Sequence, residues 1–309
     1  MPHYAKVSRK HRIRELEGNM SNTNKDQYYV PHLAKWPIVG SIGMTLTAVG
    51  AATFMNSETA TTPVLMYVGF SVIIFMVFGW FAEVIKESES NMYNPQVDSS
   101  FRMGMIWFIF SEVMFFASFF GALWYVRNLA VPWLGGEGTG LFTNLELWSG
   151  YEAVWPTNGP GDIGGKFELI DPYHLPLVNT ILLMASSITL TIAHHALIDG
   201  ARKKVISWLI ATVVLGAAFL FFQVEEYMEA YQHLDLTLKS GIYGSTFFML
   251  TGFHGMHVTL GAIMLTVITI RMIRGHFKPE SHFGFEAVAW YWHFVDVVWL
   301  GLFIFVYII

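Results

Sequence analysis

Ionisable side chains lie inside segments that are otherwise apolar enough to cross a lipid bilayer, among them Glu112, His254, His257, His293 and Asp296. An ionisable group at such a depth is costly and is, by default, a functional hypothesis. Carboxylates and imidazoles could relay protons, ligate a metal ion or bind a lipid headgroup. The alternative is that each side chain makes a hydrogen bond between helices and fixes their packing. The residue types alone leave both interpretations open.

The position of Glu112 predicts its partner. Glu112 follows Arg102 by ten residues, which places it about 15 Å into the membrane at about 1.5 Å per residue. A carboxyl at this depth is expected to be neutral unless a cation pairs with it. No Lys or Arg lies at that depth in any long apolar segment, so a histidine is the candidate partner. His257 matches the depth of Glu112 better than His254 does.

The histidines do not form a recognisable metal or haem site in the sequence. His254 and His257 are spaced to share one helix face, whereas His194 and His195 are adjacent and point to different faces. The HExxH pattern of zinc enzymes is absent, and the chain has no Cys to supply thiolate ligands. We therefore expect no metal, no haem and no catalytic residue in this chain. Two alternatives are a haem-binding membrane protein and a transporter, which would be expected to contain repeated halves.

The elements that carry these residues are long apolar runs. The chain has 309 residues, of which 54% are hydrophobic and 13% charged, whereas a soluble domain carries about 25% charged residues. About 20 apolar residues cross the hydrocarbon core as a helix. Seven runs meet this requirement, at about 36–57, 59–82, 103–126, 175–198, 205–224, 240–270 and 287–309. The sequence predicts an all-α integral membrane protein with seven transmembrane helices.

Lys and Arg are distributed unevenly among the connecting segments. With the N-terminus inside, the outer segments contain only Arg127, Lys166 and Lys239 of the 18 basic residues. Such a bias predicts an N-in, C-out orientation. Residues 1–34 are expected to form a polar, basic cytoplasmic tail without a secretory signal peptide. Met20 is a second candidate initiator beside Met1.

The spans are expected to fall into two groups. Residues 35–86 hold the first two transmembrane helices, joined by a tight hairpin just after Glu58. Residues 101–309 hold a bundle of helices three to seven. The loop at about 127–174 lies outside and is rich in Gly, Pro and Trp. Its composition predicts an ordered cap or docking surface rather than a separate domain.

Four segments together resemble subunit III of the haem–copper cytochrome c oxidases, of the bacterial type. They are FIFSEVMFFASFFGALWYVR, LPLVNTILLMASSITLTIAHHAL, GIYGSTFFMLTGFHGMHV and HFGFEAVAWYWHFVDVVW. They occur in the family's order and on the corresponding helices. The resemblance extends from about Trp36 to Ile309, and it is weaker in the 127–174 loop. The seven-helix length is similar to the cytochrome c branch, because quinol-oxidase counterparts typically have five helices.

The resemblance implies a V-shaped fold in which the two-helix and five-helix bundles enclose a phospholipid-filled cleft. The matching lipid-binding positions are Trp80, Lys86 and Glu87 on one wall, and Arg271, Arg274, His276, His282, Glu286 and Trp290 on the other. Basic residues at the membrane surface suit anionic phosphates, although ordinary positive-inside signalling explains them equally well. Lys86 stands where some relatives have Arg, so the sequence leaves the headgroup specificity open.

The resemblance also implies the function. The family's complex oxidises cytochrome c, reduces oxygen to water and pumps protons, with its haem and copper in subunits I and II. Subunit III is a non-catalytic subunit that supports proton uptake and the stability of the catalytic subunit. We accordingly expect His254, His257, His293 and Asp296 to form an interhelical polar network, and subunits I and II and phospholipids to be partners, with no nucleic acid. The basic tail favours a bacterial plasma membrane over the mitochondrial inner membrane.

Overall fold

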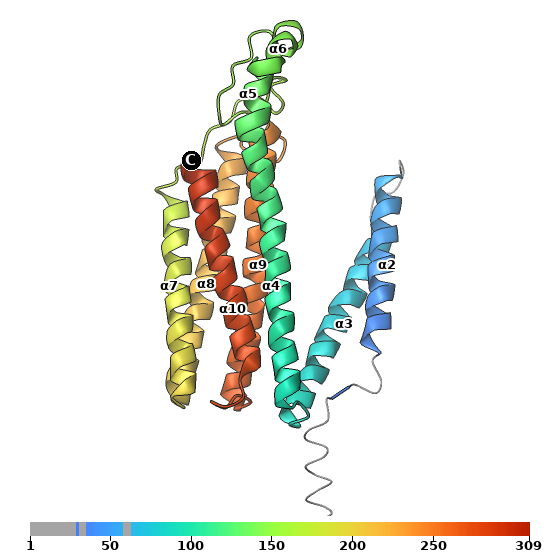
Figure 1. Ribbon diagram of the computed structural model, residues 1–309, viewed down its shortest axis with the longest axis vertical. Coiled ribbons are helices and arrows are strands. Elements are labelled where there is room, and N and C mark those ends of the chain that lie inside the picture. The colour runs from blue at the N-terminus through green and yellow to red at the C-terminus, as the bar shows by residue number, and fades with distance from the viewer. Residues whose placement is uncertain (1–28, 31–34, 58–62) are drawn as a thin grey trace, which may run out of the picture. The chain divides into compact units, whose positions relative to one another are not determined.

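The computed structural model describes residues 29–30, 35–57 and 63–309. Within them, seven helices are long and apolar enough to span a membrane, as predicted (Figure 1). They are α2 (Trp36–Met55), α3 (Val64–Glu89), α4 (Pro95–Tyr125), α7 (Leu175–Ile198), α8 (Arg202–Gln232), α9 (Gly241–Arg274) and α10 (Phe283–Leu302). The described part of the chain contains no strand, only an isolated bridge between Lys278 and Ser281. The protein is an all-α, multi-pass membrane protein.

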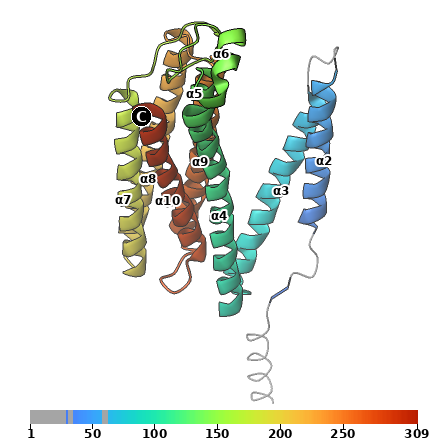
Figure 2. The ribbon, with the colours of Figure 1, turned by 45° about the horizontal axis from the view of Figure 1, so that its top comes forward.

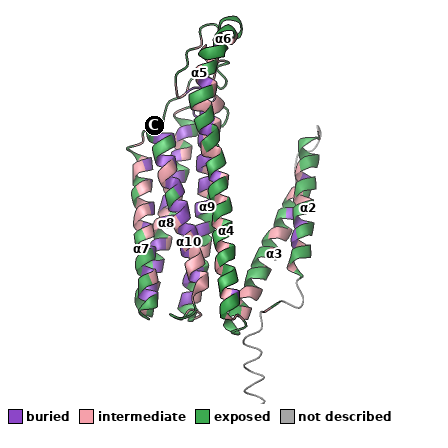
Figure 3. Cartoon of the chain, viewed as in Figure 1, coloured by how far each residue is buried: buried purple, intermediate pink, exposed green. Residues whose placement is uncertain are grey.

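The chain packs into two compact units, Met1–Phe101 and Arg102–Ile309, and the division falls inside α4. In the first unit α2 packs on α3 through glycines. A side chain on Gly50 would meet the backbone of Met66, and one on Gly69 would meet Thr47. Small residues allow such close approach between membrane helices. The remaining faces are largely exposed, as expected for lipid-facing helices (Figure 3).

In the second unit α10 forms the centre of the packing. It contacts α7 and α9, and it lies between α7 and α4 in the views of Figures 1 and 2. Trp292 and Trp299 of α10 are fully buried. The ring of Trp292 lies directly against Gly216 of α8 and Gly261 of α9. These glycines leave the space that the large indole fills.

Two helices continue past the ends of their apolar runs. α4 begins at Pro95 and passes through a π-helical turn, Val126–Ala130, into α5 (Val131–Leu134), whereas the sequence placed the loop from about 127. α8 likewise reaches Gln232 rather than ending near 224. A charged residue marks where a helix leaves hydrocarbon, but it does not stop the helix. The stop after α5 comes at Gly136, whose φ of 99° favours glycine.

The expected outer loop is ordered and packs on one end of the second unit (Figure 2). It contains the short α6 (Leu141–Leu147). Tyr243, at the start of α9, stacks on Phe167 at 5.5 Å and contacts the edge of Trp155 at 5.7 Å. Its backbone N–H donates to the carbonyl of Thr157 at 3.2 Å. The predicted tail (1–34), both candidate initiators and the hairpin after Glu58 lie wholly or almost wholly outside the described residues.

Candidate functional site

Glu112 of α4 and His257 of α9 meet inside the second unit. Oε2 of Glu112 lies 2.9 Å from Nε2 of His257. The side chain of Glu112 is 22% exposed and that of His257 is 7% exposed, so the carboxyl reaches the outer face while the imidazole is buried. The structure therefore pairs Glu112 with the histidine that its depth predicted.

The hydrogen bonds fix how many protons this pair holds. Nδ1 of His257 lies 2.6 Å from the carbonyl oxygen of Phe253. A carbonyl only accepts, so Nδ1 carries a hydrogen and donates. One further proton then sits between Nε2 and the Glu112 carboxyl, on one atom or the other. The pair is electrically neutral overall in both forms, and this lowers the cost of holding it in a membrane.

Aromatic rings hold the imidazole of His257 in place. Its centroid lies 5.0 Å from the ring of Phe116, 6.0 Å from Phe115 and 6.3 Å from Tyr291. Phe115 also contacts Phe253 edge to face at 5.0 Å. The aromatic residues of the motif that contains Glu112 thus surround the histidine that receives it.

His254 has a different environment from His257. It is 1% exposed, and its Nε2 donates to the carbonyl oxygen of Val295 at 3.2 Å. Its ring contacts Phe219 at 5.7 Å and Trp299 at 5.1 Å. His254 therefore links α9 to α10, whereas His257 links α9 to α4, so the two histidines do not act on one shared partner.

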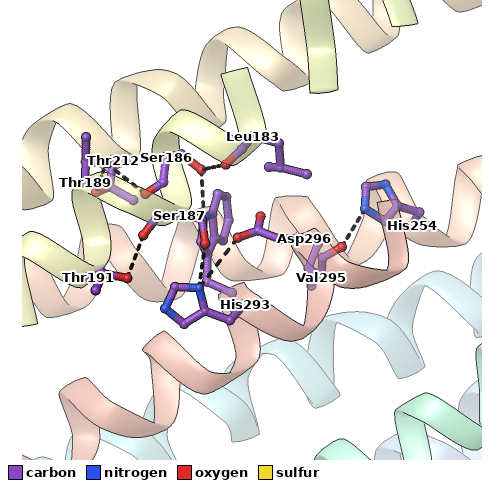
Figure 4. A network of polar contacts seen from close by, with 11 residues as sticks. Leu183, Ser186, Ser187, Thr189, Thr191, Thr212, His254, His293, Val295 and Asp296 are labelled. Atoms are coloured by element: carbon purple, nitrogen blue, oxygen red, sulfur yellow. Dashed lines mark hydrogen bonds and ion pairs between the residues drawn. The ribbon is translucent and has the colours of Figure 1, made fainter. Parts of the chain in front are cut away.

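His293 and Asp296 lie at the contact between α10 and α7 (Figure 4). Nδ1 of His293 lies 2.6 Å from the hydroxyl of Ser187 and 3.7 Å from Oδ2 of Asp296; the second distance exceeds hydrogen-bond length. Beside it, Nε1–H of Trp292 donates to Oγ of Ser186 at 2.9 Å. The predicted polar residues are thus distributed over three helix contacts, with small hydroxyl residues as additional partners.

Three residues that take part in buried hydrogen bonds were not identified from the sequence. Ser186 and Ser187 lie in an apolar run and drew no attention, although Ser and Thr in a spanning helix are a known signal of interhelical hydrogen bonds. Glu226 lies just past the apolar run at 205–224 and was not singled out from the sequence. The structure buries it completely, and the hydroxyl of Tyr307 donates to its Oε1 at 2.5 Å.

The expected lipid-binding residues of the first unit lie near the end of α3. Trp80 and Lys86 are exposed, and Glu87 is half-buried. Glu87 accepts hydrogen bonds from the hydroxyls of Tyr29 at 2.9 Å and Tyr93 at 2.7 Å. The bond to Glu87 raises the pKa of Tyr29, and burial, together with the same carboxylate, raises the pKa of Tyr93. Both phenols therefore remain donors to Glu87 at neutral pH.

The expected lipid-binding residues of the second unit lie at the end of α9 and the start of α10. Arg274 is exposed, while Arg271 is half-buried with its guanidinium 4.4 Å from the Phe277 ring centroid. His276 is half-buried directly after α9, and Trp290 is half-buried on α10. The other two residues contact each other, with Nε2 of His282 3.0 Å from Oε1 of Glu286. Glu286 also forms an ion pair with Arg102.

The family model for cytochrome c oxidase subunit III matches residues 26–139 and 143–309. The proteins named cytochrome c oxidase subunit 3 from Formosania lacustris and Gadus morhua are each 39% identical to this chain over 281 residues, which is 91% of this chain and 96% of theirs. The counterpart from Marchantia polymorpha is 39% identical over 289 residues, 93% of this chain and 98% of its own. The chain belongs to the cytochrome c oxidase subunit III family.

The resemblance predicted from the four motifs is thus confirmed. Subunit III is part of an oxidase complex and crosses the membrane several times. The match covers the helices that carry Glu112, His257 and the α10 histidine. It does not favour the alternatives of a transporter or a haem-binding membrane protein.

Proposed function

We propose that this chain is a non-catalytic subunit III that works beside subunits I and II of a proton-pumping oxidase. In this proposal the partner subunits hold the haem and copper, and this chain stabilises the catalytic subunit and supports its proton uptake. The support is the family match over nearly the whole chain. The lack of Cys agrees with it, because thiolate ligation is unavailable to this chain.

The Glu112–His257 pair is the observation that favours a structural role over a proton relay. One ring nitrogen of His257 faces Glu112, and the other donates to the backbone carbonyl of Phe253. The ring therefore has no further nitrogen with which to pass a proton onward. A neutral pair of this kind, with both ring nitrogens engaged, suits an interhelical hydrogen bond that fixes the packing of α4 on α9.

Lipid binding is the second part of the proposal. We infer that this chain binds anionic phospholipid at the inner surface of the membrane. The basic residues near the ends of α3 and α9, namely Lys86, Arg271 and Arg274, would hold the phosphates at about 1 kcal/mol each.

Orientation and localisation are the third part of the proposal. The uneven distribution of Lys and Arg supports the N-in orientation, and the basic N-terminal tail favours a bacterial plasma membrane.

Purification of the native oxidase with and without this chain tests the proposal. We expect both preparations to show the same haem spectrum and the same initial oxygen reduction. The preparation without subunit III should lose activity sooner during turnover. Stoichiometric haem or copper on the isolated chain, or an immediate loss of electron transfer, would contradict a non-catalytic role.

A further inference from the structure

Three potential metal ligands converge at the end of the second unit where α10 begins and α7 ends. They are His194 of α7, His282 at the N-cap of α10 and Glu286 in its first turn. Nε2 of His282 lies 3.0 Å from Oε1 of Glu286 and 3.4 Å from Nε2 of His194. Nε2 of His194 lies 3.9 Å from the same carboxylate oxygen. Two imidazoles and one carboxylate therefore present one atom each to a common point.

The spacing of these atoms fits a tetrahedral zinc ion. Zinc binds imidazole nitrogen and carboxylate oxygen at about 2.0–2.2 Å in tetrahedral geometry, which places any two ligand atoms about 3.3 Å apart. The three measured separations bracket this value. Two nitrogen ligands and one oxygen ligand also select a transition metal over calcium or magnesium, which prefer oxygen alone.

The surroundings orient the ligands as zinc sites require. Nδ1 of His282 lies 3.2 Å from the carbonyl oxygen of Lys278, so Nδ1–H donates and Nε2 presents its lone pair to the common point. Oε2 of Glu286 pairs with the guanidinium of Arg102, which leaves Oε1 for the metal. Such outer partners of a histidine and a carboxylate are a regular feature of metal sites.

The ring of His194 is also positioned by its neighbours. Its centroid lies 5.4 Å from that of Phe285, and it contacts the ring of His282 edge to face at 5.5 Å. The side chain of His194 is 30% exposed, while those of His282 and Glu286 are 11% and 14% exposed. The site is enclosed on most sides and remains open to an ion from the aqueous phase.

We propose that His194, His282 and Glu286 bind one zinc ion, with a fourth position open to water. This inference departs from the expectation of a metal-free chain and does not depend on the role proposed for subunit III. The site could not be predicted from the sequence, because its ligands come from two helices and His194 precedes His282 by 88 residues. The rival explanation is a metal-free cluster in which a proton on His282 satisfies the Glu286 carboxylate.

Zinc binding to the purified intact oxidase distinguishes the two explanations. Equilibrium dialysis with zinc should show one more bound ion in the wild-type complex than in His194→Gln or His282→Ala. His195→Ala is the matched control, because His195 is adjacent, exposed and outside the cluster. It should retain the wild-type stoichiometry. The haem spectrum and the amount of retained subunit III show that each variant is assembled.

X-ray absorption at the zinc edge provides a second measurement that needs no variant. Wild-type complex loaded with one equivalent of zinc should show two imidazole ligands plus oxygen, and His194→Gln should show one imidazole fewer or no tight site. Equal stoichiometry and affinity in wild type and His194→Gln would overturn the proposal. A zinc spectrum without two imidazoles in the wild-type complex would overturn it as well.

Discussion

Nε2 of His257 lies 2.9 Å from Oε2 of Glu112, which is 145 residues earlier in the chain. The contact joins α4 to α9 through one shared proton, and the Phe253 carbonyl occupies the other side of the ring. A link of this kind predicts that size and hydrogen bonding matter more at Glu112 than ionisation does.

Glu112→Gln should therefore keep assembly and most electron transfer, because the amide can donate to Nε2 of a neutral His257. Glu112→Ala leaves a buried ring nitrogen without a partner, at a cost of about 1–3 kcal/mol. We expect the Ala variant to lose subunit III more readily during detergent purification and to unfold at lower temperature. Retention of the subunit, measured against the haem content of the complex, checks this.

Ser111→Ala is the control for Glu112, since the exposed hydroxyl of Ser111 donates to the carbonyl of Phe108 on the same helix. It should behave as wild type. If Glu112→Gln abolished oxygen reduction while the haems stayed intact, the carboxyl would be an obligatory proton carrier and the structural role would be wrong.

The packing of Trp292 gives a second prediction. A methyl group on Gly216 would lie 2.8 Å from the indole, and one on Gly261 would lie 2.7 Å from it. Gly216→Ala and Gly261→Ala should each destabilise the second unit by about 1–3 kcal/mol through overpacking. Gly255→Ala is the matched control on α9, where a methyl group meets nothing within 4 Å. Thermal unfolding of the purified complex measures the difference, and equal unfolding temperatures for Gly255→Ala and Gly261→Ala would contradict it.

Replacing Arg271 and Arg274 together by Ala tests the lipid proposal. Loss of two charges should release tightly bound anionic phospholipid and shorten the active lifetime of the oxidase, while initial turnover stays near normal. Lys203→Ala with Lys204→Ala removes the same charge from two exposed positions on α8 and should keep the lipid. Lipid phosphorus per haem and the decay of activity are the measurements. Unchanged values in the arginine variant would mean that these residues serve topology alone.

Single cysteines test the orientation cleanly because the chain has none of its own. Ala201 lies between α7 and α8, and Gly161 lies in the long loop before α7, so α7 separates them. An impermeant thiol reagent added from the periplasmic side should label Gly161→Cys and leave Ala201→Cys unlabelled. The reverse pattern on the subunit III band would show that the N-terminus lies outside.

Much of this fold was predictable because length and hydropathy dominate in a membrane. The seven spans and the pairing of Glu112 with His257 follow from the cost of placing polar groups in hydrocarbon. The contact of His293 with Ser187 did not follow, because a serine in an apolar run does not reveal which way it faces. The complete burial of Glu226 did not follow either, since the sequence cannot show that Tyr307 covers the end of α8. Each of the proposed zinc ligands could be recognised in the sequence as a possible ligand. Their proximity could not be predicted, because it results from the packing of α7 on α10.

The unbroken helical path from Pro95 to Leu134 has a consequence outside the bilayer. Its 40 residues extend about 60 Å at about 1.5 Å per residue. Even a tilt of about 40° would leave roughly 45 Å along the membrane normal, whereas the hydrocarbon core is about 30 Å thick. The path is therefore longer than the hydrocarbon core is thick, and we expect it to extend past the hydrocarbon at the end that carries α5 and α6. A water-soluble protein that diffuses along this membrane surface would contact α5 and α6 before it contacts lipid. The length of the α4–α5 path therefore restricts the directions from which such a protein can approach.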